Sequence, residues 1–217
     1  MDLSVLTTCP LFHGVNEEEL SAMLSCLDAR EHSYARGELI FREGEAADRV
    51  GIVLEGEVHI SRGDHAGNRH VIGAVEPGQL FGEAFACAGI DRLPVSAQAT
   101  RDTRVLLLAC SRIISTCPAS CTFHNLVVRN LLRIVAQKNL MLSQKIQFIS
   151  QKTTREKLLA FLSAHAKAQG GGVFSIPYDR QSLADYLGVE RSAMSAELSR
   201  LKKDGVLDFH KNQFRFL

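Results

Sequence analysis

The sequence predicts an α+β fold: an N-terminal antiparallel β-roll or jelly roll, a long helix, and a small C-terminal domain of helices ending in a hairpin. Three observations lead to this prediction. Glycine occurs ten times between residues 37 and 89, and short β-rich runs lie between the glycines. Residues 122–150 contain neither glycine nor proline. Residues 180–217 hold two apolar-striped segments joined through Gly188, followed by an alternating segment.

A short helix is predicted near the N-terminus. Asn16 is followed three residues later by Glu19, which is the spacing of a capping box, and apolar residues at helical spacing follow up to Leu27. We expect this helix to pack against the strands that come next.

The β-roll is predicted from runs of β-forming residues that are separated by turn residues. Glycine adopts the positive φ angles of tight turns at little cost, so its regular recurrence indicates many short strands. We expect residues 1–121 to form one sensing domain. Its strands are predicted at 38–42, 49–54, 57–61, 69–75, 95–100 and 104–109.

The glycine-free stretch at residues 122–150 predicts one long helix for dimerisation. Four apolar pairs recur every seven residues: 127/128, 134/135, 141/142 and 148/149. Heptad spacing over three intervals is typical of a coiled-coil seam. Because each pair is two residues wide, we expect the helix to contact both its own β-roll and the same helix of a second copy. The simpler alternative is an amphipathic helix packed only on its own domain.

The C-terminal part, residues 151–217, differs in charge from the rest. It carries 11 Lys and Arg against 7 Asp and Glu, whereas residues 1–150 carry 14 against 17. A basic domain favours a polyanionic partner such as nucleic acid. A second capping box at Thr153–Glu156 predicts a helix to about Ala168, and the triple glycine at 170–172 ends it before a strand at 173–176.

Residues 180–201 predict a helix-turn-helix. Leu183 and Leu187 share one helical face, and Gly188 allows the chain to reverse. In the second helix Met194 and Leu198, with Leu201 one turn later, face inward. The alternating segment after Gly205 predicts a hairpin, with Asn212 in the left-handed turn position, so the domain is predicted to be a winged helix-turn-helix.

The outward side of the second helix supplies the candidate DNA contacts. Arg191 lies at its start, where a recognition helix reaches base edges in the major groove. Hydroxyls can bond to bases or phosphates, and cations neutralise phosphates. Arg180 and Gln181 begin the first helix, where contacts to phosphate are expected. The predicted DNA-binding residues are Arg180, Gln181, Arg191, Ser192, Ser195, Ser199 and Lys202.

Several motifs resemble the Crp/Fnr family of bacterial transcription regulators. They are Arg-Gly-Glu-Leu-Ile-Phe at 36–41, Gly-Glu-Val at 56–58, Pro-Gly-Gln-Leu-Phe-Gly-Glu at 77–83, and the helix-turn-helix. The resemblance covers nearly the whole chain. It implies a homodimer on a two-fold symmetric site in double-stranded DNA, with an effector in the β-roll relayed through the long helix. RNA polymerase is the further partner that it implies.

The resemblance also locates an effector site at Phe81, Gly82, Glu83 and Arg92. In cyclic-nucleotide-binding members, a Phe-Gly-Glu segment is followed by an Arg-Ser pair that clamps the phosphate. This sequence has Leu93-Pro94 there, and Pro has no N–H to donate. We therefore expect an effector other than cyclic AMP, mostly apolar with one acidic group, although a cyclic nucleotide stays the alternative.

The cysteines raise an alternative of their own. Cys117, Cys121 and His124 have a spacing that can hold a metal ion or form a redox pair, so a redox- or metal-responsive regulator stays open; no metal site is otherwise predicted. We expect Cys87 and Cys110, in apolar sequence, to be buried small hydrophobes.

Other classes are excluded by the sequence pattern. The longest wholly apolar run, Val105–Cys110, has six residues and is too short to cross a bilayer. No signal peptide is visible at the start, so we expect a cytoplasmic protein. The sequence contains no Gly-x-Ser-x-Gly, P-loop or His-Glu-x-x-His motif, nor the His-x-His spacing of a cupin-like enzyme. No catalytic residues are predicted, and the protein is not expected to be an enzyme.

Overall fold

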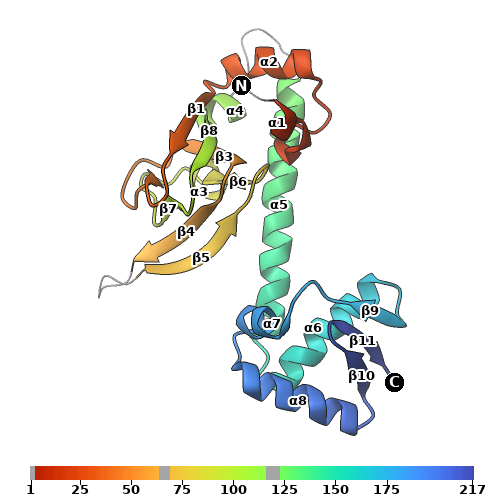
Figure 1. Ribbon diagram of the computed structural model, residues 1–217. Coiled ribbons are helices and arrows are strands. Elements are labelled where there is room, and N and C mark those ends of the chain that lie inside the picture. Colours follow the sequence, from red (N-terminus) through yellow and green to blue (C-terminus); the bar gives the residue numbers. More distant parts are fainter. Residues whose placement is uncertain (1–2, 64–68, 116–122) are drawn as a thin grey trace. The chain divides into compact units, whose positions relative to one another are not determined.

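The computed structural model describes residues 3–63, 69–115 and 123–217 (Figure 1). The chain forms two compact units, Met1–Gln137 and Lys138–Leu217, and the long helix α5 (His124–Ile149) contributes residues to both. Antiparallel sheets in the first unit and a helical second unit confirm the predicted α+β fold class.

The first unit contains two four-stranded antiparallel sheets, in the orders β1-β8-β3-β6 and β2-β7-β4-β5. All six predicted β-rich runs, four between the glycines and two after them, contain strands, so that prediction is confirmed. These strands are β2 (Leu39–Phe41), β3 (Arg49–Glu55), β4 (Val58–Gly63), β5 (Arg69–Val75), β7 (Ser96–Ala99) and β8 (Thr103–Ala109).

Two strands escaped the sequence analysis. Strand β1 (Arg30–Tyr34) reads Arg-Glu-His-Ser-Tyr, and most of its side chains are exposed because it lies at the edge of its sheet. It pairs with β8 from Arg30 opposite Leu107 to Tyr34 opposite Thr103. Strand β6 (Leu80–Phe81) has only two residues. Neither strand has an alternating apolar pattern in its sequence. Both are recognised as strands only by their backbone hydrogen bonds to a neighbouring strand.

Strands β3 and β8 are buried on both faces. Val53 and Val105 pack in an apolar cluster that draws residues from both sheets. Ile52 and Leu106 point to the opposite face and pack with the helices. This two-sided burial explains why both strands are nearly continuous apolar runs. The short helices of this unit are α1 (Ser4–Thr8), η1 (Pro10–Phe12), α2 (Glu17–Cys26), α3 (Glu83–Cys87) and α4 (Cys110–Ile114).

The predicted capping box at the start of α2 is present. The side chain of Asn16 accepts a hydrogen bond from the Glu19 N–H at 2.8 Å, and the Glu19 carboxylate accepts one from the Asn16 N–H at 3.1 Å. Leu20, Met23 and Leu24 then face the core of the first unit.

The second unit has one apolar core, built from three helices, a three-stranded sheet and the end of α5. The capping box at Thr153 is confirmed, because its hydroxyl accepts a hydrogen bond from the Glu156 N–H at 3.1 Å. The elements of this unit are α6 (Thr154–Ala168), β9 (Val173–Ser175), α7 (Arg180–Leu187), α8 (Arg191–Lys203), β10 (Leu207–His210) and β11 (Gln213–Phe216).

The hairpin of β10 and β11, with its turn at Lys211 and Asn212, is called the wing here. The prediction that Asn212 takes the left-handed conformation is wrong: Lys211 does so, with a φ of 54°. The backbone carbonyl of Asn212 accepts a hydrogen bond from the Ile176 N–H at 3.0 Å, and its side-chain amide donates to the Ile176 carbonyl. These bonds tie Asn212 to the segment after β9, so the positive φ falls on its neighbour.

Burial of the cysteines differs from the prediction in one case. Cys110 is buried as expected, but Cys87 is exposed, because it ends the short surface helix α3. Cys117 and Cys121 lie outside the described residues. In the described parts of the chain, no helix combines the length and the apolar character that crossing a membrane requires.

Candidate functional site

The predicted helix-turn-helix is formed by α7 and α8. Gly188 ends α7 in the left-handed conformation, with a φ of 60°, and this lets the chain reverse. The side chains of Met194, Leu198 and Leu201 are fully buried, as the sequence predicted for the inward face of α8. Ala184, the small residue expected where the helices cross, is fully buried too.

The first turn of α8 is capped by a residue that the sequence analysis did not single out. The Glu190 carboxylate accepts a hydrogen bond from the Ala193 N–H at 2.8 Å, and the Ser192 hydroxyl donates to the same carboxylate. These bonds, led by the one from Ser192, lower the pKa of Glu190. The cap fixes the start of the helix beside Arg191.

Helix α8 is held against α6 by a cluster of ion pairs. The Arg155 guanidinium contacts the Glu197 carboxylate at 3.1 Å and the Asp204 carboxylate at 3.0 Å. Arg200 contacts the same Glu197 at 3.2 Å. Asp204 and then Glu197 raise the pKa of Arg155. Since Glu197 is buried and both its oxygens are engaged, these contacts orient α8 from its middle to its end.

The outward face of α8 carries the predicted contact residues. Arg191, Ser192 and Ser199 are exposed, and Ser195 is half-buried. The Ser199 hydroxyl donates to the Ser195 carbonyl at 3.0 Å, a bond within the helix. Among the described residues, no hydrogen bond or ion pair engages the Arg191 side chain, so its guanidinium is available to a ligand.

Lys202 is tied to the wing. Its ammonium lies 2.6 Å from the Asp208 carboxylate and 5.4 Å from the centroid of the Phe209 ring. The hydrogen bond from Lys202 is the main reason for the lowered pKa of Asp208. Both side chains of the pair are about half exposed, at 53% and 46%. The pair therefore joins the end of α8 to the wing while its charges stay accessible.

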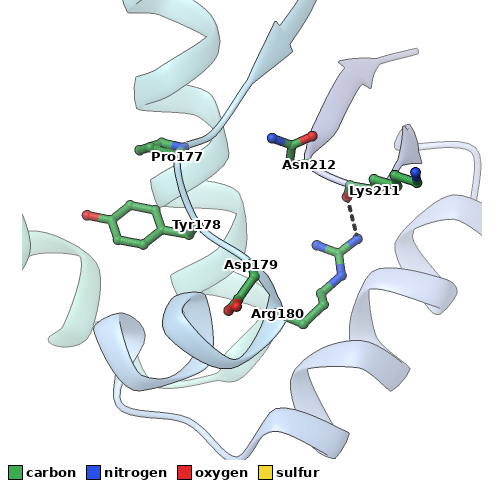
Figure 2. A pocket seen from close by; sticks show the side chains of 6 residues that line it. All are labelled: Pro177, Tyr178, Asp179, Arg180, Lys211 and Asn212. Carbon is green, nitrogen blue, oxygen red and sulfur yellow. Dashed lines mark hydrogen bonds between the residues drawn. The ribbon is translucent and has the colours of Figure 1, made fainter.

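Arg180 also contacts the wing, through its turn (Figure 2). Its guanidinium donates to the Lys211 carbonyl at 3.0 Å and lies 4.9 Å from the Phe209 ring centroid and 5.3 Å from that of Phe214. Burial lowers the pKa of Arg180. The side chain fits between the rings and the turn as a planar cation.

A pocket of about 530 Å³ opens beside this contact, lined by Pro177, Tyr178, Asp179, Arg180, Lys211 and Asn212. Asp179 caps α7 by accepting a hydrogen bond from the Ser182 N–H at 2.7 Å, and this bond lowers its pKa. The Gln181 amide donates to the Asp185 carboxylate at 2.9 Å. The two residues predicted to meet phosphate at the start of α7 thus already have partners within the domain.

The predicted effector residues lie in the first unit, around β6 and α3. Phe81 is buried and packs on Phe41, with ring centroids 5.2 Å apart. Gly82 has a φ of 79°, and a Cβ there would lie 2.9 Å from the Phe41 ring. Glu83, which begins α3, is 3% exposed. Only glycine fits at position 82. The next residue, Glu83, places its carboxylate in the interior of the unit.

Arg92 has a structural contact in this region. Its guanidinium donates to the Gly44 carbonyl at 2.7 Å, and the Leu93 backbone exchanges hydrogen bonds of 2.8 Å with Gly44 and Glu45. Leu93 is 4% exposed. The segment in which the resemblance expects a phosphate clamp is therefore paired to the β2–β3 connection. An effector contact from Arg92 stays a prediction.

A second polar pocket of about 280 Å³ lies on the sheet β2-β7-β4-β5. It is separate from the predicted effector residues. Its lining includes Arg36, His59, Ser61, Val71 and Gln98. The His59 ring nitrogen Nε2 lies 2.7 Å from the Glu57 carboxylate. No sequence pattern pointed to this pocket.

His124, the one described member of the predicted Cys-x₃-Cys-x₂-His run, is buried at the start of α5. Its Nε2 forms a hydrogen bond of 2.9 Å with the Ile113 carbonyl, so this nitrogen carries the proton. The bond gives the ring a structural partner. Whether Cys117 and Cys121 act with His124 stays a prediction.

Helix α5 divides its apolar residues between two faces. Val127, Ile134 and Phe148, one member of three predicted pairs, are buried. Ile149, which pairs with Phe148, is 38% exposed, whereas both members of the remaining pair, Met141 and Leu142, are exposed, at 68% and 61%. The other exposed large apolar side chains of α5 are Leu132, Leu140 and Ile146. A wide exposed apolar face on a single helix is typical of an interaction surface.

Sequence reasoning identified the helices and the outward residues but missed the contacts that orient them. Arg155, Glu190 and Asp208 carry these contacts and lie in three different segments of the chain. Glu190 had no clear signal, since the residues that usually cap a helix N-terminus are Ser, Thr, Asp and Asn rather than Glu. Arg155 had none, because its partners are distant along the chain, and Asp208 had none, because its contact with Lys202 forms only once the chain turns from α8 into the wing.

Two family models match the chain. The cyclic nucleotide-binding domain matches residues 31–117, and the Crp-like helix-turn-helix domain matches residues 156–217. The first covers most of the β-roll, and the second covers the helices and wing of the second unit.

Curated relatives match across both units. The cyclic AMP receptor protein of Thermus thermophilus is 28% identical over 201 residues, which are 91% of this chain and 88% of that protein. The transcriptional activator protein FnrA of Stutzerimonas stutzeri is 27% identical over 211 residues, which are 94% of this chain and 83% of that protein. Both relatives therefore span the sensing and helix-turn-helix parts together.

Solved structures agree in fold. The crystal structure of the Thermus thermophilus catabolite activator protein is 26% identical, with a TM-score of 0.51, and the match covers 96% of this chain and 93% of that one. The regulator CLP of Xanthomonas campestris, described as responsive to c-di-GMP, has a TM-score of 0.56 at 16% identity over 93% of this chain and 99% of that one. The latter similarity is one of fold alone.

Proposed function

Because this chain belongs to the Crp/Fnr family of transcription regulators, we propose that it acts as a homodimer on a two-fold symmetric site in double-stranded DNA. The chain is a DNA-binding regulator with an N-terminal sensor domain. The dimer, the operator symmetry, the effector and the contact residues are the proposed parts.

The outward face of α8 is the observation that supports DNA reading. Arg191 stands at the N-terminus of the helix, exposed and without a hydrogen bond or ion pair among the described residues, while Arg155 orients the helix from behind. A guanidinium can donate two bonds to a guanine edge, and that pairing discriminates between bases. Ser192, Ser195 and Ser199 line the same side, and we propose that they add contacts to bases or phosphates.

Cations near this face supply attraction for the DNA backbone. Lys203, Lys211 and Arg215 are exposed on α8 and the wing. Lys202 adds charge through its exposed pair with Asp208. We propose that Arg180 and Gln181, which have partners within the domain, act mainly by positioning the wing and α7. Phosphate contacts then come from the wing turn and the end of α8.

The exposed face of α5 supports the dimer. The positions 128, 132, 135, 139, 142, 146 and 149 alternate by four and three residues, which is the spacing of a heptad seam. Apart from Asn139 these residues are apolar, and Leu132, Leu142 and Ile146 are each more than half exposed, at 67%, 61% and 59%. A second copy of α5 would remove this face from water, and two-fold docking on DNA calls for half-sites about one helical turn apart.

The sensor domain would control this dimer. We propose that its effector is not cyclic AMP, since Leu93 is buried and Arg92 is bound to Gly44 where a phosphate clamp is expected. A bacterial transcription regulator acts on DNA in the cytoplasm, so we propose a cytoplasmic location. RNA polymerase is the further partner that we propose.

A binding selection with the full-length protein tests the proposal. Random duplex DNA would be enriched on the protein, and the enriched sequences would then be footprinted. We expect an inverted repeat with half-sites one helical turn apart, protected by two chains per duplex. Enrichment of asymmetric sequences bound by one chain would contradict the dimer. A lack of any enrichment would contradict specific reading by α8.

A further inference from the structure

A lysine of α6 reaches the turn between α7 and α8. The Lys157 side chain is half-buried, and its ammonium donates hydrogen bonds to the Leu187 carbonyl at 3.3 Å and to the Gly188 carbonyl at 3.4 Å. These partners lie 30 and 31 positions further along the chain. No local sequence pattern announces the contact, and the sequence analysis did not single out this lysine.

The two carbonyls stand where α7 ends. Helix α7 stops at Leu187, and the next two N–H groups turn back to bond carbonyls of α7 at 3.3 and 3.0 Å. Within the described ranges, Lys157 is the one donor to the carbonyls of Leu187 and Gly188. Carbonyls at a helix C-terminus carry partial negative charge, which a cation stabilises. Lys157 therefore caps the first helix of the helix-turn-helix and holds its turn.

The same helix α6 holds α8 at a second level. Arg155 contacts Glu197 in the middle of α8 and Asp204 at its end. Helical residues two positions apart point to different sides, so Arg155 and Lys157 act on separate parts of the motif. Arg155 fixes the body of α8, and Lys157 fixes the turn from which α8 starts.

Loss of the Lys157 contact would affect the start of α8 most. The helix would then be held mainly at its ion pairs with Arg155 and free to tilt about them. At about 1.5 Å per residue, Arg191 lies about 9 Å from Glu197, so a tilt of about 10° moves it by roughly 1.6 Å. Hydrogen-bond distances span only about 0.5 Å, so such a shift is enough to break a bidentate contact to a base edge.

We propose that Lys157 is a positioning residue for sequence-specific DNA binding. It fixes the turn of the helix-turn-helix, and with it the place of Arg191, while its own ammonium stays on the two carbonyls. This role rests on the proposed reading of DNA by α8. It differs from the role of exposed lysines such as Lys203 and Lys211, whose charge is available to the DNA backbone.

Substitution of Lys157 by Met tests this role, because Met keeps the length of the side chain and removes the ammonium. The full-length protein would be measured on the duplex enriched in the binding selection and on random DNA, across a salt series. We expect Lys157→Met to bind the enriched duplex about tenfold more weakly and random DNA less than about twofold more weakly. The salt slope should be unchanged, because no phosphate contact is lost.

Two further variants serve as matched comparisons. Lys157→Arg should restore most of the affinity, since a guanidinium can donate to the same carbonyls. Lys167→Met removes an exposed lysine from the last turn of the same helix and should bind both DNAs as the wild type does. Amide hydrogen exchange at Gly188 and Val189 should become faster in Lys157→Met and stay unchanged in Lys167→Met.

A double-mutant cycle separates positioning from a general loss of stability. If Lys157 acts through Arg191, Lys157→Met should weaken binding to the enriched duplex by less than about twofold when Arg191 is already Ala. A loss of folded protein would instead lower affinity in both backgrounds, and thermal unfolding of each variant would reveal it.

Three results would overturn the proposal. Additive losses in the cycle would show that the two side chains act independently. Equal losses on both DNAs, with a smaller salt slope, would show that Lys157 binds phosphate directly. Unchanged exchange in Lys157→Met would show that the turn does not need the lysine. A wild type that prefers no sequence would contradict the proposed function, and hydrogen exchange would then still decide whether Lys157 fixes the turn.

Discussion

At the scale of single residues, the proposed reading of DNA depends on Arg191 and on the groups that place it. Glu190 caps the helix directly before Arg191, and Arg155 holds Glu197 and Asp204 on the opposite side of the same helix. The guanidinium is therefore presented from a fixed backbone, which lowers the entropy lost when it binds.

Substitution of Arg191 should relax sequence preference. We expect Arg191→Ala to cost about 1–3 kcal/mol on the specific site and little on random DNA, because one base contact per half-site is lost. Lys202→Ala should weaken all sequences alike and reduce the salt dependence. Affinity measured on both DNAs across a salt series checks the two expectations.

The pair with Asp208 provides a control for Lys202. The single variant also exposes an unpaired carboxylate, so part of its loss would come from repulsion. Lys202→Ala combined with Asp208→Asn removes both charges and should recover part of the affinity. Equal losses for Arg191→Ala and Lys202→Ala on specific and random DNA would show that Arg191 does not read a base.

Asn139 is the polar residue in the heptad seam of α5. With 128, 135, 142 and 149 as d positions, Asn139 falls at an a position, where a buried Asn sets register and oligomeric state at a cost in stability. We expect Asn139→Ile to tighten self-association and to populate oligomers beyond the dimer. Sedimentation equilibrium measures both, with Gln144→Ile outside the seam as control. Weaker association in Asn139→Ile would contradict this register.

At the scale of elements, α5 and the wing depend on different contacts. Helix α5 has 26 residues, and its exposed apolar face is not covered in a single chain. The wing is a short hairpin stabilised by cation–ring contacts and one sheet neighbour. The exposed apolar face of α5 is expected to need a second chain to cover it. The position of the wing is expected to depend on Arg180.

A charge in the seam should separate the two chains. Leu142→Glu removes about 1.5–3 kcal/mol of apolar burial per helix and places two carboxylates at one d position. We expect monomers in analytical ultracentrifugation and loss of tight operator binding. Gln144→Glu, two residues away at an exposed position, should stay dimeric. A dimer that persists in Leu142→Glu would mean that the interface lies elsewhere.

Removal of the Arg180 side chain should loosen the wing. A cation over an aromatic ring contributes about 0.5–2 kcal/mol depending on burial, and Arg180 lies over two rings. We expect Arg180→Ala to speed amide hydrogen exchange in β10 and β11, and to weaken DNA binding. Arg215→Ala removes an exposed cation from the same hairpin and should leave exchange unchanged. Unchanged exchange in Arg180→Ala would show that the wing is held by its sheet alone.

At the scale of the whole molecule, a sensor domain and a DNA-binding domain belong to one chain, as in the relatives that span both. The sensor keeps Gly82 and the buried Glu83 of the predicted cassette. It lacks the Arg-Ser pair, and its nearest replacement, Arg92, is bonded to Gly44. Among the described residues of this cassette, the cation expected for a cyclic phosphate is thus already bonded to the backbone, although one relative is named for cyclic AMP.

We expect cyclic AMP to bind weakly or not at all. Burying a phosphate without a compensating Arg costs several kcal/mol, and the Glu83 carboxylate adds repulsion. Isothermal titration of the full-length protein with cyclic AMP is the measurement. Micromolar affinity that disappears in Glu83→Ala would show that the cassette works without its Arg-Ser pair. A control titration with the operator DNA shows that the same sample is active.

The sequence by itself determined the order of the elements and the kind of protein. Glycines such as Gly37, Gly44, Gly56 and Gly78 marked turns of the β-roll, two capping boxes marked helix starts, and Gly188 marked the turn of the helix-turn-helix. These are local signals, since turns, caps and helical spacing depend on neighbours within a few residues. The outward position of Arg191 followed from the same periodicity.

Only the tertiary structure decided what each side chain contacts. Arg155 meets Glu197 and Asp204 more than forty positions away, and Cys87 meets Cys110 across two strands. The left-handed residue of the wing is Lys211 because Asn212 is tied to Ile176. Such pairings depend on which segments the packed sheets and helices bring together, and no spacing along the chain encodes them.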